Sequence, residues 1–120
     1  MFSVYSNRTD HFEPGADGET AGAIVGMGTV LSGDDLRRAQ ALGAQFAVSP
    51  GATAELLDAA AASALPLLPG IATASELMQA QARGFGLLKF FPAEQAGGIP
   101  MLRALAGPFP ATRFCPTGGV

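Results

Sequence analysis

The sequence predicts an α/β fold built from a parallel sheet whose faces are covered by helices. Short apolar runs, each too short for a helix, recur along the chain at intervals of about 20 to 25 residues. Stretches with helical spacing of apolar residues separate these runs. Continuous apolar strands joined by single helices are typical of parallel sheets, because both faces of such strands are buried.

The predicted strands and helices alternate along the chain. The apolar runs begin near Ala23, Phe46, Pro66, Leu87 and Thr112. The helical stretches place apolar residues at Leu36, Ala39 and Leu42; at Leu56, Leu57 and Ala60; at Leu77, Met78 and Ala82; and at Met101, Leu102 and Leu105.

Residues that favour helix ends support this alternation. Ser32 precedes the first helix and Gly43 follows it, while Thr53 precedes the second. Thr73 and Glu76 have the spacing of a capping box at the third helix. The caps therefore predict the same helices as the apolar spacing.

About five such units are expected, which favours an incomplete TIM (β/α)8 barrel over a doubly wound sheet. The 120 residues are fewer than the roughly 200 that a complete barrel needs. No GxGxxG motif follows the first strand, and every strand leads into a polar or Gly/Pro loop, as the active face of a barrel requires. A flavodoxin-like sheet of five strands is the alternative.

Two segments differ in composition. Residues 1–20 are polar and have no sustained period, so we expect an atypical or disordered leader there. They lack the cationic start and apolar centre of a signal peptide. Residues 21–120 form the expected partial barrel domain.

The composition argues against several classes of protein. The net charge is −3 and no basic run is present, so we expect no nucleic-acid partner. No stretch approaches the roughly 18 apolar residues of a transmembrane helix, so we expect no membrane association and a cytoplasmic location. One histidine, one cysteine and no carboxylate cluster argue against a metal site and against a Ser-His-Asp triad.

Lys89 has the most informative position in the sequence, because it lies inside the apolar segment LLKFFPAE. Burial disfavours the charged form of a lysine, which lowers its pKa and leaves a lone pair able to attack a carbonyl carbon. The alternative is a lysine on an edge strand that reaches water. The strand pattern by itself leaves both interpretations open.

Turn residues end the predicted strands at one edge of the sheet. After the last strand, Thr117, Gly118 and Gly119 could form an anion nest from converging backbone N–H groups, or a simple turn. Cys115 just before them is expected to be a small packed apolar residue. After the first strand, the Thr29 hydroxyl could bind a carboxylate or keto oxygen, or its segment could be a tight turn.

These segments together resemble blocks of the bacterial KDPG/KHG aldolases, which are class I Schiff-base aldolases. The likeness extends from about Ala23 to Val120, and its most specific parts are KFFPAE and FCPTGG. The resemblance implies a TIM barrel of which this chain holds strands three to seven, and a reaction that needs no metal or organic cofactor.

The resemblance also implies roles for individual residues. Lys89 would form a Schiff base with the C2 ketone of 2-keto-3-deoxy-6-phosphogluconate, whose cleavage in the Entner–Doudoroff pathway gives pyruvate and glyceraldehyde 3-phosphate. Thr29 would contact the carboxylate of the pyruvate part, beside Pro50, and Phe91 would line the pocket. The phosphate would be held by Thr117, Gly118 and Gly119.

The match departs from the family pattern at both ends. The first 20 residues do not resemble the family's first two strands, which supply its general base, a glutamate, and no eighth strand is matched. Glu94 is a candidate substitute base, although a structural role in the strand-to-helix turn is favoured. We therefore expect an aldolase impaired by truncation, or alternatively a non-catalytic phosphosugar-binding or assembly fragment that completes a barrel with another chain. A homo-oligomer is expected because the family forms trimers.

Overall fold

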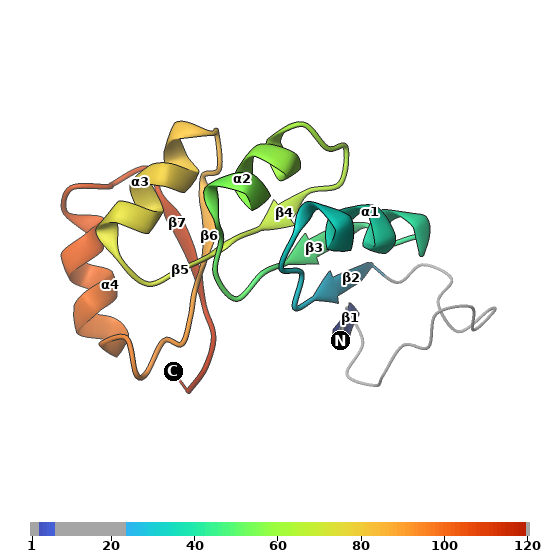
Figure 1. The fold of residues 1–120 in the computed structure, drawn as a ribbon. Helices are drawn as coiled ribbons and strands as arrows, with labels where there is room; N and C mark the ends of the chain where they lie inside the picture. Colours follow the sequence, from blue (N-terminus) through green and yellow to red (C-terminus); the bar gives the residue numbers. More distant parts are fainter. Residues whose placement is uncertain (1–2, 7–23, 120) are drawn as a thin grey trace.

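A computed structural model describes residues 3–6 and 24–119 of the chain (Figure 1). The strands are β1 (Ser3–Ser6), β2 (Val25–Gly28), β3 (Phe46–Val48), β4 (Leu67–Leu68), β5 (Gly70–Ile71), β6 (Leu87–Phe90) and β7 (Arg113–Pro116). The helices are α1 (Gly33–Ala41), α2 (Ala54–Ala61), α3 (Ala74–Ala82) and α4 (Gly98–Ala106). From β2 onward, strands and helices alternate except where β5 follows β4 directly.

The parallel strands lie in the order in which they occur in the sequence. β2, β3 and β4 are parallel neighbours in one sheet, and β5, β6 and β7 are parallel neighbours in a second. A flavodoxin-like sheet would place its second strand outside its first, so that alternative is wrong. Sequential β/α units are the architecture of a barrel, and the prediction of an incomplete TIM barrel is confirmed.

One predicted strand is divided into two at Pro69. Leu67 and Leu68 pair with β3, whereas Gly70 and Ile71 pair with β6. Proline has no backbone N–H to donate, which interrupts the ladder at this position. The sequence predicted a single strand beginning near Pro66. The break turns the chain from the first sheet to the second.

β1 is a strand that we did not expect. It pairs antiparallel with β2, with Val4 opposite Met27, and so covers one edge of that strand. Four residues are too few for a period of 2 to be recognised in sequence, and the backbone of β2 provides the partner. The other positions of the predicted leader lie outside the described residues.

The predicted helix caps are present. The Ser32 hydroxyl accepts a hydrogen bond from the Asp35 N–H at 3.2 Å, and the Thr53 hydroxyl accepts one from Leu56 at 3.0 Å. Thr73 and Glu76 form a complete capping box at the start of α3. Each cap satisfies backbone N–H groups that have no partner within the first helical turn.

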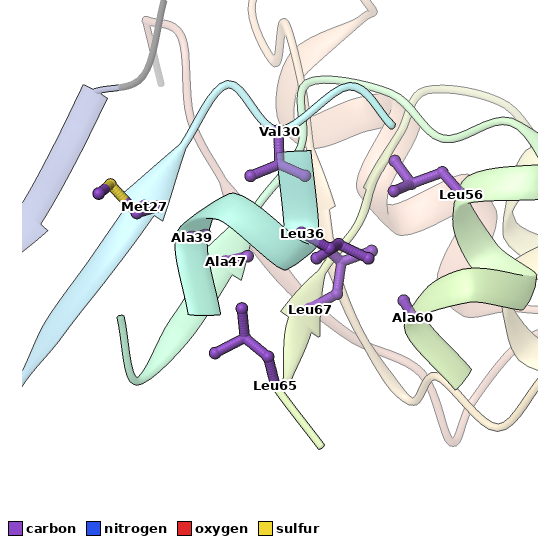
Figure 2. Packing of buried hydrophobic residues seen from close by; sticks show 9 residues of the cluster. All are labelled: Met27, Val30, Leu36, Ala39, Ala47, Leu56, Ala60, Leu65 and Leu67. Atoms are coloured by element: carbon purple, nitrogen blue, oxygen red, sulfur yellow. The ribbon is translucent and has the colours of Figure 1, made fainter. Parts of the chain in front are cut away.

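The helices pack against the sheets through two apolar clusters. Figure 2 shows the first, which joins α1 and α2 to β2, β3 and β4 and contains Met27, Val30, Leu36, Ala39, Ala47, Leu56, Ala60, Leu65 and Leu67. The second contains Leu57, Ile71, Leu77, Ala80, Leu88, Phe90, Ala93 and Leu105. Because α2 supplies Leu56 to one cluster and Leu57 to the other, it connects the two sheets.

Within the residues that the structure describes, no helix combines the length and apolar character needed to cross a bilayer.

Candidate active site

Lys89 lies on β6 between two residues that pack against the helices. Leu88 and Phe90 are fully buried in the second cluster. Successive side chains of a strand alternate between its faces, so Lys89 points to the opposite face, the inside of the partial barrel. Lys89 is only 8% exposed there. The structure therefore disagrees with the interpretation of Lys89 as a lysine that reaches bulk water.

The neighbouring strands hold Lys89 in register. Its backbone N–H donates to the Pro69 carbonyl at 2.9 Å, and its Cα pairs with Gly70 on β5 and with Cys115 on β7. Residues in register on parallel strands point to the same face, so the Cys115 side chain shares the face of Lys89. Cys115 is partly exposed.

Two effects of opposite sign act on the Lys89 amine. Burial removes water from the ammonium form and lowers the pKa of Lys89, while the charge of Cys115 acts in the opposite direction and raises it. The net change is a lowered pKa. A larger fraction of Lys89 is therefore neutral at a given pH than of an exposed lysine, and the neutral amine is the nucleophilic form.

Phe91 lies directly beside this amine. The Lys89 Nζ atom is 4.5 Å from the centroid of the Phe91 ring, a cation–π distance. The ring provides an apolar wall at the carboxyl end of β6 while still stabilising an ammonium or iminium charge next to it.

The bend after β7 is attached to the chain that follows Lys89. The Ala93 and Glu94 N–H groups donate to the carbonyls of Thr117 and Gly118 at 2.8 and 3.0 Å. Gly118 has a φ of 93°, which favours glycine, and a side chain there would press on the backbone of Pro92 and Ala93. The structure thus brings the bend next to the loop after Lys89.

Thr117 carries a buried hydroxyl oxygen that has no hydrogen-bond partner among the described residues. Buried hydroxyl groups nearly always have a partner, so an orphan at this position is consistent with a polar ligand that would supply one.

Thr29 and Pro50 follow β2 and β3, at the same carboxyl-terminal edge. Thr29 is exposed and has a φ of 57°, an uncommon value for a residue with a side chain. The Pro50 carbonyl lies where a side chain of Gly70 would begin, and Gly70 is the strand partner of Lys89. Thr29 belongs to the first sheet, two strands from the division at Pro69.

Two informative features were missed in the sequence. Ser49 is fully buried, and its hydroxyl accepts a hydrogen bond from the Gly70 N–H at 3.3 Å, a long-range contact that its place in a Ser-Pro-Gly turn does not indicate. Lys89 is also the only lysine in the chain, which is visible in the sequence and singles it out among the cations.

Other candidate sites have less support. No group of three His, Cys, Asp or Glu side chains within the described ranges could hold a metal ion. A pocket of about 140 Å³ lies between the first turns of α2 and α3, lined by Ala52, Ala54, Ser75, Glu76 and Gln79. It contains none of the predicted site residues, and the Glu76 carboxylate is already engaged by the backbone of Ala72 and Thr73.

Sequential parallel β/α units with a buried lysine facing their inner side define a barrel-type protein with a candidate nucleophile. The family model described as KDPG and KHG aldolase matches residues 16–120. The chain belongs to this family.

Individual relatives agree with this assignment. The chain is 54% identical over 102 residues to the KHG/KDPG aldolase of Escherichia coli K12, covering 85% of this chain and 48% of that protein. It is 53% identical over 96 residues to the 2-dehydro-3-deoxy-phosphogluconate aldolase of Pseudomonas aeruginosa, covering 80% of this chain and 44% of that protein. The chain therefore spans about half the length of the curated relatives that it matches.

Solved structures of the same family have a similar fold. The Legionella pneumophila KDPG aldolase, with pyruvate captured at low pH as a covalent carbinolamine intermediate, matches with a TM-score of 0.76 and 53% identity over 78% of this chain and 45% of that one. The Zymomonas mobilis ZM4 aldolase with 3-phosphoglycerate matches with a TM-score of 0.75 and 48% identity, over 78% of this chain and 44% of that one.

Proposed function

We propose that the chain is a class I aldolase that cleaves 2-keto-3-deoxy-6-phosphogluconate to pyruvate and glyceraldehyde 3-phosphate through a Schiff base on Lys89. The observation that carries this proposal is the burial of the only lysine on the inner face of β6, with its pKa lowered by desolvation. The covalent carbinolamine with pyruvate in the Legionella relative supports it.

The chemistry requires a neutral amine and an electron sink. The Nζ lone pair attacks the C2 carbonyl, and loss of water from the carbinolamine leaves a positively charged iminium. The electrons of the C3–C4 bond then flow toward the iminium nitrogen as the proton of the C4 hydroxyl is removed, which releases glyceraldehyde 3-phosphate and leaves an enamine. Protonation of the enamine at C3, followed by hydrolysis, gives pyruvate and restores Lys89.

The remaining predicted residues are proposed as the substrate site. Phe91 would flank the iminium, because its ring lies 4.5 Å from the amine. Thr117, Gly118 and Gly119 would hold the phosphate, supported by the unpartnered Thr117 hydroxyl and by the glycine conformations of the bend. Thr29 and Pro50 would bind the keto-acid end from the carboxyl ends of β2 and β3.

Borohydride trapping tests the proposal with little ambiguity. Sodium borohydride reduces an imine between pyruvate and an amine to a stable secondary amine, which mass spectrometry locates by peptide. Lys89 and the N-terminal α-amino group are the only primary amines that the sequence provides, so an adduct on the Lys89 peptide is expected. Lys89→Arg should abolish that adduct and leave the N-terminal background as an internal control. An unlabelled Lys89 peptide at saturating pyruvate would overturn the proposal.

The alternative, a non-catalytic phosphosugar-binding or assembly fragment, predicts a different result. Such a fragment would bind the phosphorylated keto acid without the Lys89 adduct, and isothermal titration would detect this binding. We further propose a cytoplasmic homo-oligomer, a trimer as the family resemblance implies, which sedimentation velocity would test.

A further inference from the structure

Ser49 forms hydrogen bonds on both sides of the division at Pro69. Its backbone N–H donates to the carbonyl of Leu68, the last residue of β4, at 3.1 Å. Its hydroxyl accepts a hydrogen bond from the N–H of Gly70, the first residue of β5, at 3.3 Å. Ser49 and Pro69 are both fully buried. A single residue after β3 therefore holds the chain just before the division and just after it.

The strand that Ser49 holds sets the position of Lys89. The Pro69 carbonyl accepts a hydrogen bond from the Lys89 N–H at 2.9 Å, and the Ile71 carbonyl accepts one from the Phe91 N–H at 3.2 Å. β5 contains only Gly70 and Ile71, so few ladder bonds of its own keep it in place. A displacement of β5 therefore moves the backbone of Lys89 and Phe91 with it.

Of the two bonds of Ser49, only the bond to β5 depends on its side chain. The bond to Leu68 uses the backbone and persists whatever side chain stands at position 49. The bond to Gly70 requires an acceptor on the side chain, which alanine lacks. Without it, water must enter to satisfy the Gly70 N–H, beside the strand position of Lys89.

We propose that Ser49 is a positioning residue for Lys89, because its hydroxyl fixes β5 through the Gly70 N–H and so aligns the Lys89 amine for attack on the substrate carbonyl. This inference rests on the proposed function, since it assumes that Lys89 is the nucleophile. Ser49 acts on Lys89 through β5. A shift of about 1 Å in a reacting group lowers a rate by as much as about a hundredfold, so one hydrogen bond at the neighbouring strand is sufficient for a large effect.

The time course of imine formation with pyruvate tests the inference on the full chain. Borohydride stops the reaction at a series of times, and mass spectrometry measures the adduct on the Lys89 peptide per folded molecule. Ser49→Ala should lower the rate constant at saturating pyruvate about ten- to a hundredfold and change the half-saturating concentration less than about threefold. A purely structural role would lower the folded fraction and leave this rate constant unchanged.

The pH profile of the same rate constant provides a second measurement. Water that replaces the Ser49 hydroxyl reduces the desolvation that lowers the pKa of Lys89. The profile of Ser49→Ala should therefore move to higher pH, because a smaller fraction of the amine is neutral at a given pH. Cys115, whose charge also acts on Lys89, is unaltered in this variant.

Two further variants separate position from stability. Ser49→Cys has a similar volume and a weaker acceptor at the same place, so its rate constant should fall less than that of Ser49→Ala. It also provides the test if Ser49→Ala does not fold. Ala39→Gly is the control, because it destabilises α1 at a buried position in the first cluster. It should leave the rate constant per folded molecule within about twofold of that of the unaltered chain.

The outcomes distinguish the inference from the proposed function. Unchanged rate constants in the Ser49 variants, with normal trapping on Lys89, would overturn the inference and leave the proposed function intact. An equal fall in Ala39→Gly would also overturn the inference, because the effect would then follow stability. Absence of the Lys89 adduct in the unaltered chain would overturn the proposed function, and the inference with it.

Discussion

The Ser49 hydroxyl accepts a hydrogen bond from the Gly70 backbone N–H at 3.3 Å, at the point where one strand divides into β4 and β5. Gly70 is the strand partner of Lys89, so this contact links the turn after β3 to the position of the candidate nucleophile. The division at Pro69 leaves the Gly70 N–H without a carbonyl acceptor from β3, and the Ser49 side chain supplies the acceptor.

Ser49→Ala should destabilise the chain by about 1–3 kcal/mol, because it leaves a buried N–H without its acceptor. The free energy of unfolding in urea measures this effect. Ser63→Ala is the control, since the Ser63 hydroxyl bonds within its own turn, to the Leu65 N–H, at a partly exposed site. Equal losses of stability in the two variants would contradict the role assigned to Ser49.

Gly70→Ala should also be destabilising, for a steric reason. A methyl group at Gly70 would collide with the backbone of Ser49 and Pro50, which cannot shift without moving the end of β3. We expect a loss of roughly 1–3 kcal/mol or more in the free energy of unfolding.

Gly51 provides a matched comparison for Gly70. A methyl group added at Gly51 would have no neighbouring atom within 4 Å among the described residues. Gly51→Ala should therefore change stability by no more than about 0.5 kcal/mol. If Gly70→Ala were tolerated as well as Gly51→Ala, the close approach of the Pro50 carbonyl would not exist in solution.

Cys115→Ser should shift the pH dependence of the Lys89 adduct toward lower pH. The charge of Cys115 raises the pKa of Lys89 against the larger effect of burial, so its removal lowers that pKa further. The initial rate of borohydride trapping by pyruvate, measured over a pH series, reports the neutral fraction of the amine. Cys115→Ala should shift the profile in the same direction. A shift to higher pH in both variants would contradict the assigned interaction.

Lys89→Met should stabilise the chain at neutral pH, by roughly 1 kcal/mol, because methionine fills a similar volume without a charge to desolvate. The pKa of Lys89 is lowered in the folded state from 10.5, so folding releases protons in the window between the lowered value and 10.5. Below that window the desolvation penalty is fully present. As pH rises through the window, the unaltered chain gains stability while Lys89→Met does not.

Urea unfolding at pH 7 and at higher pH measures the free energy of unfolding of the unaltered chain and of Lys89→Met. The difference in free energy between the two proteins should narrow as pH approaches 10.5. If Lys89→Met were the less stable protein at pH 7, the Lys89 ammonium would be better stabilised by Phe91 and its surroundings than burial alone allows.

Sequence alone predicted the alternation of strands and helices from β2 onward and the places where α1, α2 and α3 begin, but not β1 or the division between β4 and β5. A helix cap such as that of Thr73 with Glu76 is formed by residues only three positions apart in the sequence. Such a cap can therefore be predicted without knowledge of the tertiary structure. The position of Lys89 within an apolar strand was likewise visible from the neighbouring residues in the sequence. The family motifs around Lys89 and around Thr117 identified the class of protein before any contact between them was known.

Tertiary structure decided which residues share the face of Lys89. The alternation of a strand limits the lysine to one of two faces, but only packing of Leu88 and Phe90 on the helices selects the inner one. Its neighbours Gly70 and Cys115, the acceptor role of Ser49 and the position of Glu94 over Gly119 all depend on register between strands that are distant in sequence. Hydrogen bonds between strands and the packing of side chains set that register. Both depend on segments that are distant in sequence, so the residues of one segment do not predict them.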